Sequence, residues 1–344
     1  MKTMKTRDNT SPYIIAEMSA NHGGDLKTAL KIVEEAYLAG ANCLKTQTYT
    51  ADSLTIDCQK ESFRIQNGLW ESQYLYQLYE NAYTPWEWQP IIKEKCDALG
   101  IDFLSTPFDT AGVDFLEGLN VSAYKIASFE LVDLPLIAYT AAKKKTMYLS
   151  CGMATLDEIW EAIRACEQAG NTDIVLLKCC SEYPADYKNM HLSTIKDMQQ
   201  IFQYPVGLSD HSLGALSSII ACALDACVIE KHFCLSRSQN TPDSAFSMEP
   251  AEFKSMVEQI RQVEIIKGSP LFGPSSSEIS SLVFRRSIFA VRDISQGEEF
   301  TPENIRIIRP GYGIAPKYFN QLLGQTSKRN IQRGDPIIDS DLEC

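Results

Sequence analysis

The chain repeats one short pattern eight times: an apolar run rich in Val, Ile and Leu, then polar residues, then a helical pattern. Fully buried parallel strands ordinarily read as continuous apolar runs, so a polar end on every run indicates a shared functional surface. The runs end at Glu17 and Ser19, Lys45 and Gln47, Thr106, Lys125 and Ser128, Ser150, Lys178 and Ser181, Ser209 to His211, and Glu230 to His232. Because the carboxyl ends of all strands meet at one mouth in a (β/α)8 barrel, the sequence predicts an α/β chain with a TIM barrel.

The apolar runs also give the expected limits of the elements. We expect strands at Tyr13–Ala20, Cys43–Thr48, Asp102–Pro107, Ala123–Ser128, Thr146–Cys151, Asp173–Cys180, Pro205–His211 and Cys227–Phe233. Residues 49–84 interrupt the alternation of strands and helices, and the next helix is expected to begin at Pro85. A long insertion after a barrel strand lies over the mouth, so we expect this one, which carries Trp70, to shape substrate specificity.

A barrel needs about 250 residues, so a chain of 344 residues has room for a second, smaller domain. The sequence predicts a barrel over residues 1–267, a linker rich in Gly, Pro and Ser over 268–284, and a small β-rich domain over 285–344. Its expected β-like pieces are SIFAVRDI, NIRIIRP and PIIDSDL. A domain of about 60 residues has little core, so we expect it to lean on a barrel, either its own or a partner's.

Composition excludes several classes of function. The formal net charge of −12 argues against a nucleic-acid partner. No apolar stretch reaches 18 residues, and residues 1–10 lack the apolar centre of a secretion signal, so we expect a soluble, cytoplasmic protein without a membrane partner. Eleven cysteines without C-x-x-C spacing predict reduced, mostly buried thiols.

Two histidines, His211 and His232, end neighbouring strands of the predicted barrel. Imidazoles so placed can share one metal ion and leave positions open for substrate and water. Asp210 and Glu230 could then orient an imidazole or complete the coordination. The alternative is that each histidine only caps a loop through hydrogen bonds.

Lysines and hydroxyls surround the predicted mouth. Lys45 and Lys125, with Lys178 and Lys231 as lesser candidates, stand where a barrel ordinarily places apolar residues. Such cations beside many hydroxyls indicate a phosphate or carboxylate ligand, although a strand-end lysine also pairs with carboxylates and one of them could form a Schiff base. Glu17, flanked by apolar residues, is the candidate for general acid–base work; its alternative is a buried ion pair with a barrel lysine.

Several of these segments resemble one known family. The segments IIAEMSANHGG, KTQTY, FLSTPFD, YKIAS, VGLSDHS and VIEKHF resemble the sialic acid synthase family, which condenses phosphoenolpyruvate with a hexose-type sugar to give a nine-carbon ulosonic acid. The segments RRSIFAVRDISQGE and IRIIRPGYGI resemble that family's C-terminal antifreeze-like (SAF) domain. KTQTYTADSLTID, GLW, AYTPWEW and DSAFSMEPAEFKSMV are most similar to the pseudaminic acid branch.

The resemblance implies a role for each candidate residue. It implies a divalent metal, Mn²⁺ or Mg²⁺, on His211 and His232, and catalytic roles for Glu17 and Lys125. It implies substrate binding by Lys45, Gln47, Thr106, Ser128, Ser150, Ser181, Tyr183, Ser209, Asp243 and Arg309. Arg309 would reach the N-acyl group of the sugar from the other subunit of a domain-swapped homodimer. Cys151 and Ser181 stand where the family usually carries Thr and Asn, and both are expected to face the mouth.

The implied reaction joins phosphoenolpyruvate to an N-acylated amino sugar, 2,4-diacetamido-2,4,6-trideoxy-L-altrose, and releases phosphate. The nearest alternative is the same reaction on the sugar that gives N-acetylneuraminate or legionaminate. A metal-dependent barrel aldolase would release no phosphate. A non-catalytic sugar-binding protein would leave the eight polar strand ends without a cause.

Overall fold

The computed structural model describes residues 11–342 of the chain. Contacts divide the chain into two compact units, with the boundary between Gly268 and Ser269. Each unit is described by itself below.

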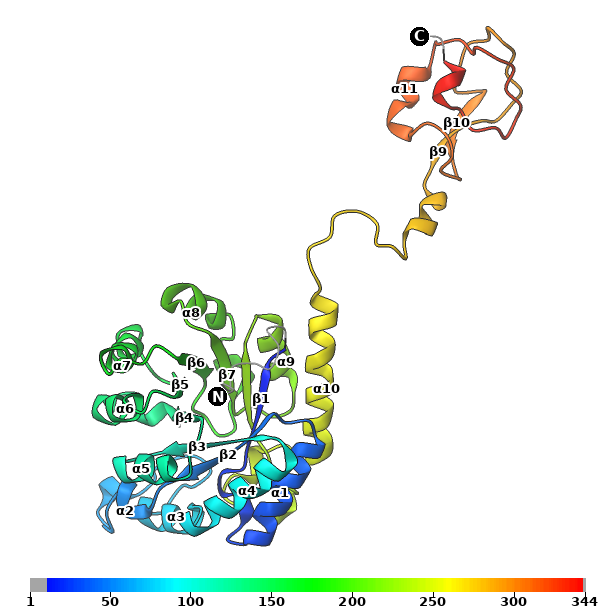
Figure 1. Ribbon diagram of the computed structural model, residues 1–344. Coiled ribbons are helices and arrows are strands. Elements are labelled where there is room, and N and C mark those ends of the chain that lie inside the picture. Colours follow the sequence, from blue (N-terminus) through cyan, green and yellow to red (C-terminus); the bar gives the residue numbers. More distant parts are fainter. Residues whose placement is uncertain (1–10, 343–344) are drawn as a thin grey trace. The chain divides into compact units, whose positions relative to one another are not determined.

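The first unit is a parallel barrel, so the predicted TIM-like architecture is confirmed (Figure 1). Its strands are β1 (Tyr13–Glu17), β2 (Cys43–Thr48), β3 (Asp102–Pro107), β4 (Ala123–Ile126), β5 (Thr146–Ser150), β6 (Ile174–Cys179), β7 (Val206–Asp210) and β8 (Val228–His232). They pair in the order β3-β2-β1-β8-β7-β6-β5-β4. β3 and β4, at the two ends of this order, also contact each other, so the barrel is nearly closed.

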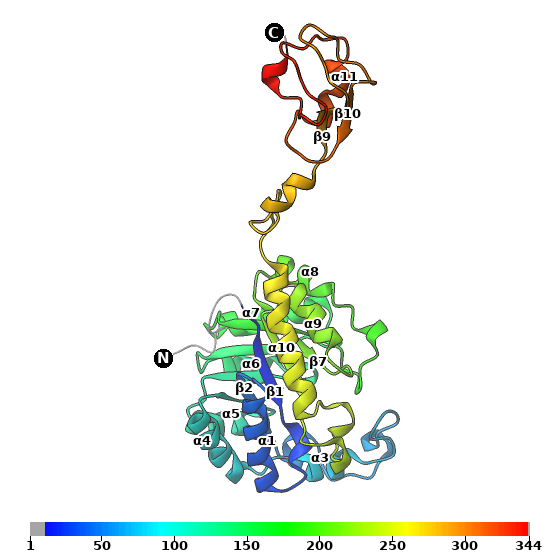
Figure 2. The ribbon, with the colours of Figure 1, turned by 90° about the vertical axis from the view of Figure 1, so that its right-hand side faces the viewer.

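Helices surround the strands in Figure 1. They are α1 (Leu26–Leu38), α4 (Gln89–Leu99), α5 (Thr110–Gly118), α6 (Leu134–Ala141), α7 (Leu156–Gln168), α8 (Thr194–Phe202), α9 (Leu216–Ala223) and α10 (Pro250–Lys267). α7 shows why these segments form helices at these positions. At its start the Thr155 hydroxyl accepts from the backbone N–H of Glu158, and the Glu158 carboxylate accepts from the backbone N–H of Thr155. Along its length Ile159 and Ile163 lie on one face, which packs against the core. α10 packs against α9 and α1 and so closes the ring (Figure 2).

The interior of the barrel changes from apolar to polar along each strand. Residues two apart on a strand share a face, so Ile15 and Glu17 of β1 both point inward. Tyr13, Ile15, Cys43, Leu104 and Tyr148 belong to the apolar cluster inside the barrel. The next inward positions toward the carboxyl ends are Glu17, Lys45, Thr106 and Ser150. The apolar floor therefore supports a layer of polar and charged groups.

The predicted limits differ from the observed ones at several strand ends. β1 ends at Glu17 instead of Ala20, because Ser19 takes φ 44° and begins a 3-10 turn at Ser19–His22. The helix expected at Pro85 is a 3-10 turn at Trp86–Trp88 that leads into α4. The interrupting segment contains two short helices, α2 (Ala51–Leu54) and α3 (Leu75–Ala82).

The second unit is small and has a core of its own. β9 (Ser287–Ala290) pairs antiparallel with β10 (Ile305–Ile308), and α11 (Phe319–Leu322) lies between later turns. Ile288, Phe300 and Ile337 belong to its apolar cluster. The β-like piece expected in PIIDSDL forms no regular strand: Pro336 and Leu342 each make an isolated β-bridge, and a 3-10 turn lies between them at Asp339–Asp341. The expected linker ends in a 3-10 helix at Ile279–Phe284.

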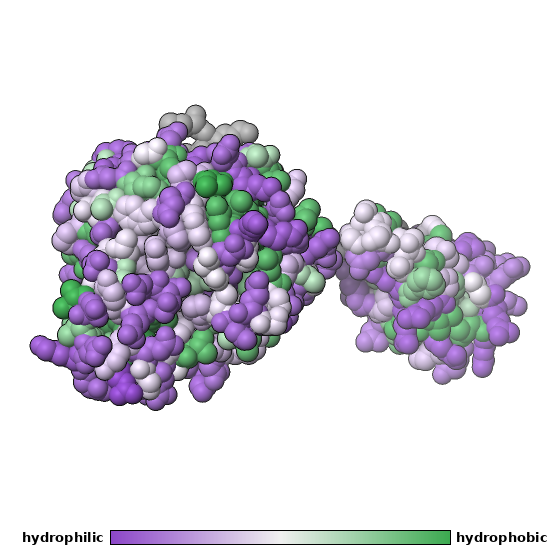
Figure 3. All heavy atoms as spheres, turned by 90° about the horizontal axis from the view of Figure 1, so that it is seen from below, coloured by the Kyte–Doolittle hydropathy of each residue, from purple (hydrophilic) through white to green (hydrophobic). Residues whose placement is uncertain are grey.

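Surface and thiol chemistry agree with the composition. On the face seen in Figure 3, hydrophilic side chains predominate and hydrophobic ones form small scattered groups. Ten of the eleven cysteines lie within the described residues, and all ten are free thiols. Among the helices of residues 11–342, none is both long and apolar enough to cross a membrane.

Candidate active site

The carboxyl ends of the strands surround a cavity of about 450 Å³. All the site residues that the resemblance implies within the barrel line it. These residues are Glu17, Lys45, Gln47, Thr106, Lys125, Ser128, Ser150, Ser181, Tyr183, Ser209, His211, His232 and Asp243. Arg309 lies in the second unit, directly after β10, and its predicted contact with substrate stays a prediction.

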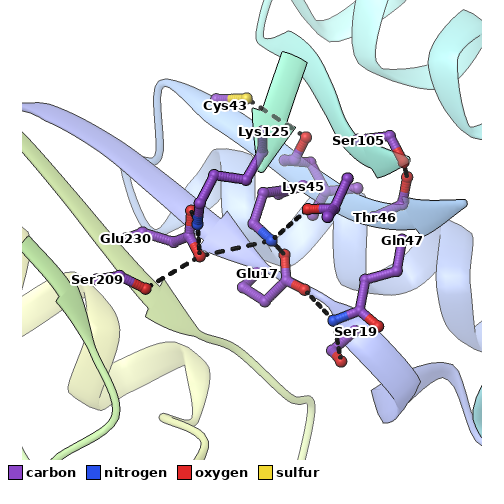
Figure 4. Close-up of polar contacts among 12 residues, drawn as sticks. Glu17, Ser19, Cys43, Lys45, Thr46, Gln47, Ser105, Lys125, Ser209 and Glu230 are labelled. Atoms are coloured by element: carbon purple, nitrogen blue, oxygen red, sulfur yellow. Dashed lines mark hydrogen bonds and ion pairs between the residues drawn. The ribbon is translucent and has the colours of Figure 1, made fainter. Parts of the chain in front are cut away.

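Two buried lysines and two buried glutamates form the floor of the cavity (Figure 4). Lys45 Nζ lies 2.9 Å from Glu17 Oε2 and 3.4 Å from Glu230 Oε1. Lys125 Nζ contacts both oxygens of Glu230, at 2.9 and 2.8 Å. Ser209 Oγ donates to Glu230 Oε1 at 3.3 Å. Charges removed from water to this degree need such partners, and here each charged group has at least one.

The two carboxylates differ in their affinity for a proton. Burial raises the pKa of Glu17 to about 7, and the nearby negative charge of Glu230 adds to this, although Lys45 opposes both. Burial would also raise the pKa of Glu230, but Lys125 and Lys45 outweigh it and lower that pKa. Glu230 therefore stays ionised as a counter-charge, while Glu17 can gain or lose a proton near neutral pH. The ion pair of Glu17 with Lys45 is therefore present, and the acid–base role of Glu17 stays a prediction.

Hydroxyl groups extend this floor toward β5. Thr106 Oγ1 lies 3.3 Å from Lys45 Nζ, and Ser128 Oγ accepts from the backbone N–H of Gly152 at 3.1 Å. Ser150 Oγ is buried and has no hydrogen-bond partner in the described residues. A partnerless buried hydroxyl beside cations is suited to an anionic oxygen of a ligand.

His211 and His232 lie side by side, with ring centroids 5.4 Å apart. His211 Nδ1 lies 2.9 Å from the carbonyl oxygen of Cys180, an arrangement that leaves Nε2 free to bind a metal. His232 Nδ1 is buried and has no hydrogen-bond partner within residues 11–342, and burial lowers the pKa of this imidazole, which favours its neutral, metal-binding form. In that same part of the chain they belong to no cluster of three or more His, Cys, Asp or Glu side chains able to hold an ion. The pair fits a metal whose other positions are filled by water and substrate.

Four neighbouring residues that were expected at the site lie outside the cavity, and strand alternation explains their positions. Lys231 and Asp210 point to the outer face of the sheet, where they form a fully buried ion pair at 2.9 Å. Asp210 also accepts from Ser212 and Ser218 and so orients no imidazole. Lys178, likewise outward, lines a separate pocket between α7 and α8. Cys151 lines that outer pocket as well and not the mouth.

The sequence reasoning missed several residues that line the cavity, among them Tyr49, Tyr79 and Glu130. Glu130 follows Ser128 in a 3-10 turn (Ser128–Glu130), and its Oε2 is buried without a hydrogen-bond partner in the described residues. Burial raises its pKa to about 7. Its place just beyond a polar strand end was the available signal. A carboxyl group so placed is suited to a hydroxyl or amide of a bound sugar.

Comparisons with known proteins agree with this geometry. Residues 32–271 match the model of the NeuB family, and residues 285–343 match the SAF domain. The chain is 43% identical to a pseudaminic acid synthase of Campylobacter jejuni over 96% of both chains, and 41% identical to one of Helicobacter pylori over 96% of this chain and 98% of that protein. The crystal structure of N-acetylneuraminic acid synthetase from Leptospira borgpetersenii superposes with a TM-score of 0.71 at 30% identity, covering 80% of this chain and 91% of that one.

Enzymes of this family depend in general on a metal ion, in keeping with the histidine pair. The family match spans most of the barrel, and the curated relatives share both domains in nearly full length. The chain therefore belongs to the NeuB family of sialic acid synthase-type enzymes.

Proposed function

We propose that this chain is a pseudaminic acid synthase that condenses phosphoenolpyruvate with 2,4-diacetamido-2,4,6-trideoxy-L-altrose and releases phosphate. The observation that carries the proposal is the single cavity that joins a buried lysine pair, a partnerless serine hydroxyl and a histidine pair. The identities of 41–43% to pseudaminic acid synthases over 96% of the chain support this branch of the family.

Phosphoenolpyruvate is anionic, and the floor of the cavity offers the matching groups. Lys45 and Lys125 would face its phosphate and carboxylate, with Ser128, Ser150 and Ser209 as hydroxyl donors. These groups are held in place before the substrate arrives, so they stabilise developing charge without reorganising.

We propose that His211 and His232 hold a divalent ion, Mn²⁺ or Mg²⁺. When bound, it supplies a Lewis acid for the sugar aldehyde. The residues of the chain do the rest: the lysines hold phosphoenolpyruvate so that its C3 faces the aldehyde carbon. C3 then forms a bond to the aldehyde carbon, and the aldehyde oxygen gains a proton and becomes a hydroxyl. Water adds at C2 and loses its protons, and phosphate leaves with cleavage of its C–O bond, so that C2 becomes a keto carbon. Glu17 would take up or return one of these protons.

Arg309 completes the proposal. We propose a domain-swapped homodimer in which the small domain of one subunit brings Arg309 to the sugar in the partner's barrel. The planar guanidinium group can bind an amide carbonyl and a hydroxyl together.

The test is a panel of candidate sugars incubated with phosphoenolpyruvate and Mn²⁺, with phosphate measured by colour and products identified by mass. The expected product is the acid derived from the L-altrose sugar. A clear preference for N-acetylmannosamine would move the chain to the neuraminic branch, and product without phosphate release would indicate an aldolase.

A further inference from the structure

A buried ion pair that the proposed reaction does not use lies on the outer face of the barrel wall, next to the histidine pair in the sequence. Lys231 Nζ lies 2.9 Å from Asp210 Oδ2, and both side chains are fully buried. Asp210 directly precedes His211, and Lys231 directly precedes His232. The two charged residues are also partners in the register of β7 and β8. The ion pair therefore joins the two strands one residue before each histidine.

The same ion pair also fixes the residue that follows His211. Asp210 Oδ1 accepts from the backbone N–H of Ser212 at 2.9 Å and from its hydroxyl at 2.7 Å. Lys231 Nζ donates to the carbonyl oxygen of Ser212. Ser218, on α9, donates to the other carboxylate oxygen of Asp210 at 2.7 Å. We call these four residues the strand-end network. It ties the chain on both sides of His211 to β8 and to α9.

Stability alone does not account for this ion pair. Taking two charges out of water costs free energy, and replacing a buried ion pair by apolar residues of similar size is often neutral or stabilising. The best-attested use of buried charged groups is to fix one register. β7 ends at Asp210, one residue before His211, so the strand-end network holds the two strands where the ladder of β7 stops.

We propose that the Lys231–Asp210 ion pair sets the spacing of His211 and His232 and thereby the affinity of their site for a divalent metal ion. This inference rests on the proposed function, in which the histidine pair holds the metal. Lys231 and Asp210 are positioning residues: neither lines the cavity, and they act through the backbone that carries each imidazole. Because metal–nitrogen bond lengths vary little, a site with two protein ligands loses affinity when their separation changes.

Position and charge predict opposite results for one variant. Lys231→Met removes a positive charge near the metal site, so an effect of charge alone would make Mn²⁺ bind more tightly. Loss of the spacing predicts weaker binding. Asp210 keeps its hydrogen bonds from Ser212 and Ser218 in this variant, so its charge is not left without partners. The double variant Asp210→Asn/Lys231→Met keeps the net charge, and charge alone then predicts the wild-type affinity.

The measurement is Mn²⁺ binding to the full chain without substrate, followed by the electron paramagnetic resonance signal of free Mn²⁺. We expect Kd to rise about tenfold in both variants, as when groups that support metal ligands are lost, and kcat at saturating Mn²⁺ to change less. Ser105→Ala is the matched control. It removes buried hydrogen bonds to Thr46 and Thr48 on the outer face of β2 and β3, so it should lower Tm and leave Kd unchanged.

Circular dichroism checks that each variant folds. If the double variant does not fold, Ser212→Ala tests the same network, because it removes one of the hydroxyls that donate to Asp210, and Kd should rise by less. Unchanged Kd in the folded variants, or tighter binding by Lys231→Met, overturns the inference alone. An equal rise in Ser105→Ala does the same. A wild-type chain that binds no Mn²⁺, or binding that survives His211→Ala/His232→Ala, overturns the proposed metal site and the inference with it.

Discussion

Removal of the charge of Glu230 tests the buried lysine pair most directly. Glu230→Gln keeps the shape of the side chain but leaves the ammonium groups of Lys45 and Lys125 without their shared counter-charge, at contacts of 3.4 and 2.8 Å. Breaking a buried ion pair costs about 3–5 kcal/mol. Since 1 kcal/mol corresponds to about 2–4 °C in a domain of this size, we expect Tm to fall by about 6–20 °C.

Phosphoenolpyruvate should reverse part of this loss. Its negative charges would bind beside the same two lysines, and removal of the Glu230 carboxylate removes repulsion against them. At one fixed concentration of phosphoenolpyruvate, the rise in Tm should therefore be larger in Glu230→Gln than in the wild type.

The assay is thermal unfolding followed by circular dichroism, with and without phosphoenolpyruvate. Glu258→Gln, an exposed change on α10, is the matched control and should unfold like the wild type. A Tm of Glu230→Gln within about 2 °C of the wild type would refute the argument that these lysines need Glu230. A smaller rise with phosphoenolpyruvate would show that it binds elsewhere.

Three further predictions concern turnover. Burial raises the pKa of Glu17, so kcat, which reports the substrate complex, should rise with pH as Glu17 becomes ionised. Glu17→Gln should remove this rise and lower kcat at least about 100-fold, and a variant with normal kcat would make Glu17 structural. Chelation should abolish phosphate release and Mn²⁺ should restore it, whereas turnover by a chelated His211→Ala/His232→Ala variant would exclude the metal site. Arg309→Ala and Glu17→Gln chains refolded together should recover about a quarter of wild-type activity, since half of random dimers contain one intact site; mixed dimers without activity would disprove shared sites.

The barrel could be predicted because each strand buries two faces and ends at a functional mouth. Apolar runs marked the strands, and polar residues marked the carboxyl ends. The alternation of side chains along a strand also determines which polar residues cannot reach the mouth. Glu230 and His232 are two apart and share the inner face, so Lys231 between them had to point outward, as it does. The sequence alone could therefore have excluded Lys231 from the site.

Other features had no periodic signal. Glu130 enters the cavity from a turn of three residues, which is too short to show a pattern. β1 ends at Glu17 because Ser19 takes a positive φ. A serine in the sequence does not predict this conformation, which non-glycine residues rarely adopt. In the second unit, regular strands are only four residues long, so turns and isolated bridges carry most of its structure.

The charge of the site explains how an acidic chain can hold an anionic substrate. The chain carries a formal charge of −12, yet the floor of the cavity contains two lysines, the ionised Glu230 and Glu17. With Glu17 ionised the four charges cancel, which makes their burial tolerable. With Glu17 protonated the floor has one net positive charge, which favours an anion. Because burial raises the pKa of Glu17 to about 7, both forms are populated near neutral pH. Protonation of Glu17 therefore converts the neutral floor into the positively charged floor that favours phosphate and carboxylate groups.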